Sequence, residues 1–361
     1  MARDGRQRWR RAAVALVGLG AAALAARVLY DSSDELLTAA DTLTSVQVGW
    51  VVVAVLVEVV SYAARGAANA VVLRRGGGGA GVTTLSAATL ASDAAAYCLP
   101  FGFAASGLVM VDVLRRRRVS AAVAGWMFAV CSVFYVSSVT VLTLIAVQIA
   151  GDDDPIAGLQ AISGGLLGAL VVFGAGYALL RRPAVRRRLT HLLHRSRIAS
   201  GRVARWAPLR AFLRDWAQQL RTVRLTPLAG AAAFAFMMVS WVADVSVLAI
   251  AFLALHSAPP WTGLLLAYCA GQIAASLPVT PGGIGVVEGS ITLALVAFGG
   301  AETITLAAVL LYRLIAYWGC LPAGGLAWLV LRITAPAAVE EPAAARDAPM
   351  SPAVVEAEPL P

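Results

Sequence analysis

The sequence contains no lysine and few charged residues of any kind, although it is 361 residues long. Charged side chains make up 14% of the chain and hydrophobic side chains 60%, and the mean hydropathy is +0.78. Soluble globular domains rarely have this composition, whereas helical membrane proteins commonly do. The scarcity of charge therefore argues against an ordinary soluble domain and predicts an all-α polytopic membrane protein.

Motifs for metals, disulfides and nucleotides are also missing. The four cysteines lie in separate apolar segments without CxxC or Cys/His ligand spacing, which supports neither a disulfide framework nor a metal site. The three histidines form no catalytic constellation. The GGIG sequence at 282–285 is not followed by Gly-Lys-Ser/Thr and is therefore not a P-loop. We expect no cofactor, no metal and no nucleotide.

The net charge of +9 is carried by 29 arginines, many of them between apolar stretches, which suits an anionic lipid surface better than nucleic acid. Segment 181–224 holds thirteen arginines against one aspartate, with tryptophans and leucines at helical spacing. This pattern predicts a basic amphipathic helix on the inner leaflet. The residues expected at the lipid surface are Arg202, Arg205, Trp206, Arg210, Arg214 and Trp216. The charge alone also fits a cytoplasmic loop that only sets the topology.

Apolar stretches long enough to cross a bilayer, about 20 residues, recur along the chain. Six full spans are predicted at about 12–30, 46–66, 119–150, 156–180, 228–255 and 303–331. A bend is expected in the last span near Pro322 and the following Gly324-Gly325. The Pro-, Ala- and Glu-rich residues 334–361 are predicted to be a disordered tail.

Two further apolar stretches, 82–114 and 261–299, each carry a Pro/Gly break near the middle. Arginine-rich loops stay cytoplasmic, so residues 1–11, the loops at 74–75 and 115–118, and segment 181–224 are placed inside. Both termini are then cytoplasmic. For this topology each broken stretch must begin and end on the same side of the membrane. Both are therefore predicted to be re-entrant helical hairpins, one from each face.

The predicted elements repeat. Residues 12–150 read span, span, hairpin, span, and residues 156–333, which include segment 181–224, read the same way. Because three full spans separate the two breaks, the second repeat is inverted relative to the first. Inverted repeats with broken helices that meet near the midplane are typical of transporters.

The candidate site lies at the second break. Charged residues inside a membrane are functional candidates by default, and Glu288 follows the PGGIG break, where a half-helix begins. The expected substrate-binding residues are Pro278, Thr280, Pro281, Gly282, Gly283, Gly285, Glu288 and Arg313, with Pro100 and Gly102 on the first hairpin. Free amides at such a break can hold a phosphate. A tight turn needs the same residues, and the alternative for Glu288 is that it only caps the helix or pairs with Arg313.

Other charges lie within the predicted spans and hairpins. Glu58 and Arg65 share one face of the second span, and Asp244 lies on the span at 228–255. We expect the side chain of Arg65 to extend along its helix toward the inner surface of the membrane. For Asp93 the simplest expectation is a helix cap within the first hairpin.

The second break carries a resemblance to a known family. Residues 277–288 (LPVTPGGIGVVE), followed by 311–318 (LYRLIAYW), resemble the lysylphosphatidylglycerol synthase transmembrane-region family. Residues 99–102 resemble its weaker first motif, although this chain has Phe103-Ala104-Ala105 where the family is usually more polar. The resemblance covers most of residues 10–333. It implies two hairpins that face each other and an association with moving lipids between leaflets. The full enzyme also has a soluble aminoacyl-transferase domain, which nothing after residue 333 is expected to supply.

These observations favour a flippase-like protein of the bacterial inner membrane that moves a phospholipid or lipid-linked headgroup between leaflets. Its expected partners are anionic membrane lipids. Movement would be downhill or coupled to an ion gradient, with Glu288 as the expected proton-sensitive group. Two alternatives remain open. One is a membrane-embedded enzyme acting on a lipid phosphate or lipid-linked sugar, for which no catalytic constellation is found. The other is a non-transporting partner of a lipid-pathway enzyme.

Overall fold

The computed structural model describes residues 46–98, 102–151, 225–276 and 280–335. Within these ranges every regular element is a helix, which confirms the all-α prediction. Several sequence predictions lie outside the described residues. They are the spans at 12–30 and 156–180, the basic segment 181–224 with its lipid-surface residues, the tail beyond residue 335, and both hairpin prolines, Pro100 and Pro278.

Four long helical stretches among the described residues are long and apolar enough to cross a membrane. They are α3 (Val48–Arg75), α6 (Ala121–Ala150), α10 (Pro227–Ala254) and the continuous stretch Glu302–Ile333. Hydroxyl side chains cap two of them: the Val123 amide donates to Ser120 Oγ at 3.2 Å, and the Ala229 amide to Thr226 Oγ1 at 3.4 Å. These helices match the spans predicted near 46–66, 119–150, 228–255 and 303–331.

The shorter helices form two helical hairpins. In the first, α4 (Val82–Cys98) packs against α5 (Gly102–Arg116). In the second, α11 (Trp261–Ser276) is followed by the one-turn helix η2 (Pro281–Gly283) and packs against α12 (Val286–Ala297). Gly102, the first residue of α5, permits the close approach of the two helices, because a Cβ there would collide with the carbonyl oxygen of Ala96 in α4.

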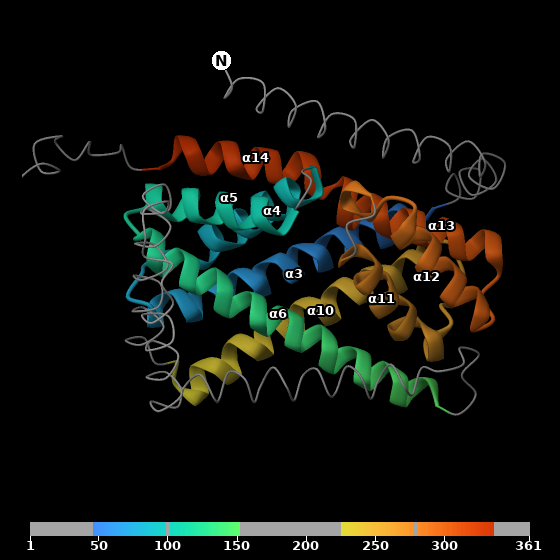
Figure 1. Ribbon diagram of the computed structural model, residues 1–361. Coiled ribbons are helices and arrows are strands. Elements are labelled where there is room, and N and C mark those ends of the chain that lie inside the picture. The colour runs from blue at the N-terminus through green and yellow to red at the C-terminus, as the bar shows by residue number, and fades with distance from the viewer. Residues whose placement is uncertain (1–45, 99–101, 152–224, 277–279, 336–361) are drawn as a thin grey trace, which may run out of the picture.

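The centre of the fold is the crossing of α3 and α10, which lie side by side in Figure 1. The Gln47 amide donates to the Ala254 carbonyl at 3.0 Å, and the hydroxyls of Ser61 and Ser240 lie 3.0 Å apart. The start of α3 thus meets the end of α10, so the two helices run antiparallel.

Each hairpin packs against the final long helix of the other half of the chain. Helix α4 lies against α14 (Cys320–Ile333), and α11 lies against α6. The first contact depends on small residues, because a Cβ on Gly324 would lie 2.5 Å from the Ala94 Cβ and 2.7 Å from the Leu90 carbonyl oxygen. Such close helix approach through glycine is common in membrane proteins. The two halves are therefore interlocked rather than merely adjacent.

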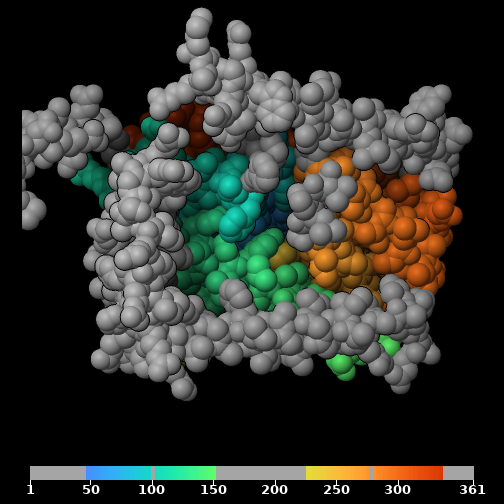
Figure 2. All heavy atoms as spheres, in the orientation of Figure 1, coloured from blue at the N-terminus to red at the C-terminus, as the bar shows by residue number. Residues whose placement is uncertain are grey.

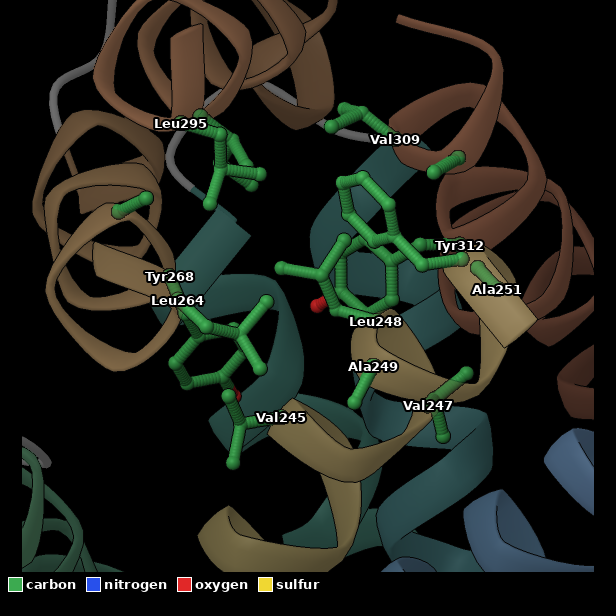
Figure 3. Packing of buried hydrophobic residues seen from close by; sticks show 14 of the residues in the cluster. Val245, Val247, Leu248, Ala249, Ala251, Leu264, Tyr268, Leu295, Val309 and Tyr312 are labelled. Atoms are coloured by element: carbon green, nitrogen blue, oxygen red, sulfur yellow. The ribbon is translucent and has the colours of Figure 1, made fainter. Parts of the chain in front are cut away.

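The main buried cluster fills the space between α10, α11, α12 and α13 (Glu302–Arg313). Figure 3 shows Leu248 of α10 beside Tyr268 of α11 and Tyr312 of α13. A second cluster joins α3 to α4, α5 and α6. Many large apolar side chains at the start of α3 remain exposed, among them Val52, Leu56 and Val59. An outward apolar face on a long helix is what lipid contact requires.

The last long helix is interrupted earlier than the sequence predicts. The π-helical turn η3 spans Leu314–Trp318, upstream of the expected bend at Pro322. Proline has no amide hydrogen and cannot donate to the carbonyl four residues earlier. The preceding turn widens instead, and the Gly319 amide donates to the carbonyl of Leu314, five residues back, at 2.8 Å.

We predict that Gly324→Ala destabilises the protein by about 1–3 kcal/mol, because the added methyl group overpacks the contact of α14 with α4. The measurement is the thermal unfolding midpoint of the purified protein in detergent.

Gly325→Ala is the matched control, since a Cβ at this neighbouring position meets nothing within 4 Å. Its midpoint should stay the same or rise, because alanine is the better helix former. Equal midpoints for the two variants would contradict the close α4–α14 contact.

Candidate functional site

The second break is a tight turn that requires glycine. Gly282 has φ +65° and Gly285 has φ +82°, both in the left-handed region that other residues rarely adopt. A Cβ on Gly282 would also collide with the ring of Tyr317. Thr280 supports the turn, because its Oγ1 donates to the carbonyl of Ile284 at 2.9 Å. Pro281 begins η2, where its fixed φ is compatible with a helical start.

Glu288 closes the break from the first turn of α12. Its Oε2 accepts a hydrogen bond from the Gly285 amide at 2.7 Å, so it satisfies one of the free donors at the start of this helix. Its Oε1 accepts a hydrogen bond from Arg313 Nε at 2.6 Å. A carboxylate at a helix N-terminus is also favoured by the helix dipole.

Arg313 connects the turn to the last long helix. Its Nη2 donates to the carbonyl of Gly282 at 3.0 Å, and its guanidinium lies 4.2 Å from the centre of the Tyr317 ring. The side chains of Arg313 and Glu288 are only 8% and 14% exposed. Because a buried charge without a partner is strongly unfavourable, each of these groups depends on the other.

The two hairpins meet at this site. Helix α4 packs against η2, and the rings of Tyr97 and Tyr317 lie 4.8 Å apart. Figure 2 shows a recessed region between the atoms of the first hairpin and those of the second. The second hairpin thus presents its charged turn to the aromatic end of the first.

A second ion pair lies on the first-repeat side. Arg65 of α3 binds Asp93 of α4 at 2.7 Å, and its guanidinium lies 4.5 Å from the centre of the Tyr62 ring. Two expectations are therefore wrong. Asp93 does not cap a helix, because it lies inside α4, and Arg65 turns to Asp93 instead of extending toward the inner surface. A neutralising partner within reach is the stronger attraction for a charge at low dielectric.

Of the eight predicted substrate-binding residues that the structure describes, seven lie together. Gathered around the second turn are Thr280, Pro281, Gly282, Gly283, Gly285, Glu288 and Arg313. Gly102 lies apart, at the start of α5 against Ala96 of α4. Pro100, Pro278 and the six lipid-surface residues lie outside the described residues.

Sequence reasoning missed the aromatic partners Tyr62, Tyr97 and Tyr317. A tyrosine in an apolar helix carries no signal of its own. The spacing of Tyr317, four residues after Arg313, and of Tyr62, three residues before Arg65, places each ring beside a guanidinium on one helical face. That spacing is the signal by which both could have been found.

The part of the chain that the structure describes holds no group of three His, Cys, Asp or Glu residues suited to a metal ion. The cysteines are free thiols, of which Cys131, Cys269 and Cys320 are buried and Cys98 is exposed. Cys320 accepts a hydrogen bond from the Tyr62 hydroxyl at 3.3 Å, as part of the packing between α3 and the last helix.

The long apolar helices and the buried ion pairs at paired hairpins define a multi-pass α-helical membrane protein. The chain belongs to the family described as lysylphosphatidylglycerol synthase TM region, which matches residues 11–324. The resemblance of residues 277–288 and 311–318 to that family is thereby confirmed. A search of curated proteins gave no significant match.

We predict that Glu288→Gln and Arg313→Gln each lower the free energy of unfolding by about 3–5 kcal/mol, because each leaves a buried charge without its partner. The double variant should lose clearly less than the sum of the two single losses. The measurement is reversible unfolding of the purified protein in mixed micelles.

The half-exposed pair of Asp112 and Arg116, at 3.0 Å, provides the control. Asp112→Asn should change the same free energy by about 0.5 kcal/mol or less. Strictly additive losses at Glu288 and Arg313 would show that the buried pair is not an energetic unit.

Proposed function

We propose that the protein moves a phospholipid, or a lipid-linked headgroup, between the two leaflets of the bacterial inner membrane. The observation that carries this proposal is the buried pair of Arg313 and Glu288, which lies on an irregular backbone turn where the two hairpins meet. Irregular backbone and charge at membrane depth persist only where protein buries them or where they line a polar path. Membership of the transmembrane-region family supports the same proposal.

The proposed arrangement places both hairpins as re-entrant elements of an inverted repeat. Three observations support it. The corresponding helices α3 and α10 run antiparallel, α4 packs on α14 while α11 packs on α6, and α4 reaches η2 of the opposite hairpin. Reciprocal contacts of this kind follow when two similar halves are related by an axis in the membrane plane. Both termini are proposed to be cytoplasmic, in keeping with the arginine-rich segments.

The chemistry of the site suits a phosphate-bearing headgroup. The guanidinium of Arg313 is planar and charged at all physiological pH values, and such groups bind phosphate oxygens through paired donors. In the described structure its donors are engaged by Glu288 and the Gly282 carbonyl. A phosphate that enters between the hairpins would replace Glu288 as a partner of Arg313. The released carboxylate is then able to accept donors of the headgroup.

The exchange explains how a polar headgroup can pass a hydrophobic interior. At every stage Arg313 has an anionic partner, first Glu288 and then the phosphate, so its charge is never left unpaired. The aromatic rings of Tyr97 and Tyr317 beside it give the rest of the headgroup and the glycerol an amphipathic wall. The movement needs no nucleotide. We propose that it is downhill or coupled to an ion gradient.

We predict that Glu288→Gln lowers the rate of lipid movement at least tenfold, because the exchange partner of Arg313 loses its charge. The measurement is the loss of fluorescence of labelled phosphatidylglycerol in proteoliposomes when a membrane-impermeant quencher is added outside.

Two further variants separate function from folding. The double variant Glu288→Gln/Arg313→Gln removes both charges, so it should be folded yet equally inactive. Asp112→Asn, at a half-exposed position away from the turn, should move lipid at the wild-type rate. A folded Glu288→Gln protein with the wild-type rate would refute the role of this carboxylate.

A further inference from the structure

A second group of buried acids lies at the crossing of α3 and α10, away from the Glu288 turn. Glu58 of α3 is only 9% exposed, and its Oε2 has no hydrogen-bond partner among the described residues. Burial of an ionised carboxylate without a donor is strongly unfavourable. The position of Glu58 therefore needs a physical explanation that the pair of Arg313 and Glu288 does not provide.

The group that faces Glu58 is another carboxyl. Asp244 of α10 interacts directly with Glu58 across the helix crossing. Its Oδ2 already accepts hydrogen bonds from the hydroxyls of Tyr268 and of Tyr312, the latter at 3.2 Å. These tyrosines reach α10 from α11 and α13 (Figure 3). Both tyrosine hydroxyls thus donate to Asp244, and the group that faces Glu58 is a carboxyl oxygen, which accepts hydrogen bonds.

Two facing carboxylates repel each other unless a proton lies between them. When one of them carries a proton, the contact becomes a hydrogen bond, as in the carboxyl pair of aspartic proteases. The packing around the pair opposes separation, because the hydroxyl oxygens of Ser61 and Ser240, one turn along each helix, lie 3.0 Å apart and join α3 to α10 at that point.

The surrounding groups do not neutralise the pair. The charged neighbours are Arg65 on α3 and Asp93 on α4, and they bind each other at 2.7 Å. Further titratable neighbours are Tyr135 of α6 and Cys320 of α14, and neither carries a positive charge in any protonation state. Three carboxyl groups consequently share one guanidinium in this region, and one added proton removes the excess repulsion between Glu58 and Asp244.

We propose that Glu58 and Asp244 form a proton-binding site at the crossing of α3 and α10, in which the two carboxyl groups share one proton. Binding transfers a proton from water to a carboxylate oxygen and forms an O–H bond that donates to the facing carboxylate. Release breaks that bond and returns the proton to water. The site is distinct from Glu288, whose oxygens both accept hydrogen bonds from protein donors.

The pair is connected to the proposed lipid site through one turn of α13. Tyr312 donates to Asp244, while the next residue, Arg313, donates to Glu288 and to the Gly282 carbonyl. The π-helical turn η3 follows immediately, and such turns are frequent where a helix adjusts during function. A change of charge on Asp244 alters its bond to Tyr312 and thereby the position of Arg313. This coupling rests on the proposed function, whereas the proton site does not.

The proton site is tested by infrared spectroscopy of the purified protein in lipid, titrated from neutral to alkaline pH. The wild type should show the absorption of a buried protonated carboxyl, which disappears on titration. Glu58→Gln should lose this absorption, and Asp244→Asn should shift it. Glu302→Gln is the control, since this acid is exposed at the start of α13, and it should leave the absorption unchanged.

The infrared spectrum of the wild-type protein can by itself overturn the proposal, even if a variant fails to fold. Absence of a protonated-carboxyl absorption at neutral pH would do so, as would its persistence unchanged in both Glu58→Gln and Asp244→Asn. Loss of the absorption when sodium chloride replaces choline chloride would assign the pair to a metal cation instead and would also overturn it.

The coupling is tested separately with the labelled-phosphatidylglycerol proteoliposomes under an imposed pH gradient. The wild-type rate should change severalfold with the gradient, and the Glu58→Gln rate should be insensitive to it. A wild-type rate that ignores the gradient would refute the coupling. If the wild type moves no lipid at all, the proposed function fails, while the infrared result for the proton site stands by itself.

Discussion

The whole arrangement depends on one constraint: a broken helix inside a membrane must find partners for its free backbone groups and for any charge it carries. Here Arg313 and Glu288 provide them together. Glu288 accepts the Gly285 amide, Arg313 donates to the Gly282 carbonyl, and the two side chains bind each other. The turn, the start of α12 and the last long helix are thereby joined at one buried point. The same groups are those that a phosphate-bearing lipid would need, so the structural and the proposed functional roles coincide.

Interlocking of the two halves places this point where the two hairpins meet. Because α4 packs on α14 and α11 packs on α6, each hairpin is in contact with the other half of the chain. The antiparallel crossing of α3 and α10 lies between them and carries its own buried acids, Glu58 and Asp244. Tyr312 of α13 donates a hydrogen bond to Asp244, and the adjacent residue Arg313 donates one to Glu288. The proposed headgroup site and the proposed proton site are thus contacted by adjacent residues of one helix.

Much of this fold could be predicted from the sequence, because membrane spans and their interruptions leave strong signals. The apolar runs located the four long helices among the described residues, although α3 continues to Arg75, and the Pro/Gly breaks separate the paired helices α4 and α5 and the paired helices α11 and α12. The contact of Glu288 with Arg313 was one of two interpretations that the sequence left open. The pair of Arg65 with Asp93 and the facing of Glu58 with Asp244 were not predictable, since helix rotation and partner choice depend on packing between distant segments. The π-helical turn η3 arises from a backbone bond that residue types alone do not reveal.

The central claim is that a lipid headgroup occupies the meeting point of the two hairpins. The most direct measurement is photo-crosslinking with phosphatidylglycerol that carries a photoreactive group on its headgroup, followed by mass spectrometry of the labelled peptides. The account predicts labelling of residues 280–288 and of the turns that hold Tyr97 and Tyr317, competed by unlabelled phosphatidylglycerol. Labelling confined to the exposed apolar face at the start of α3, near Val52 and Leu56, would contradict it.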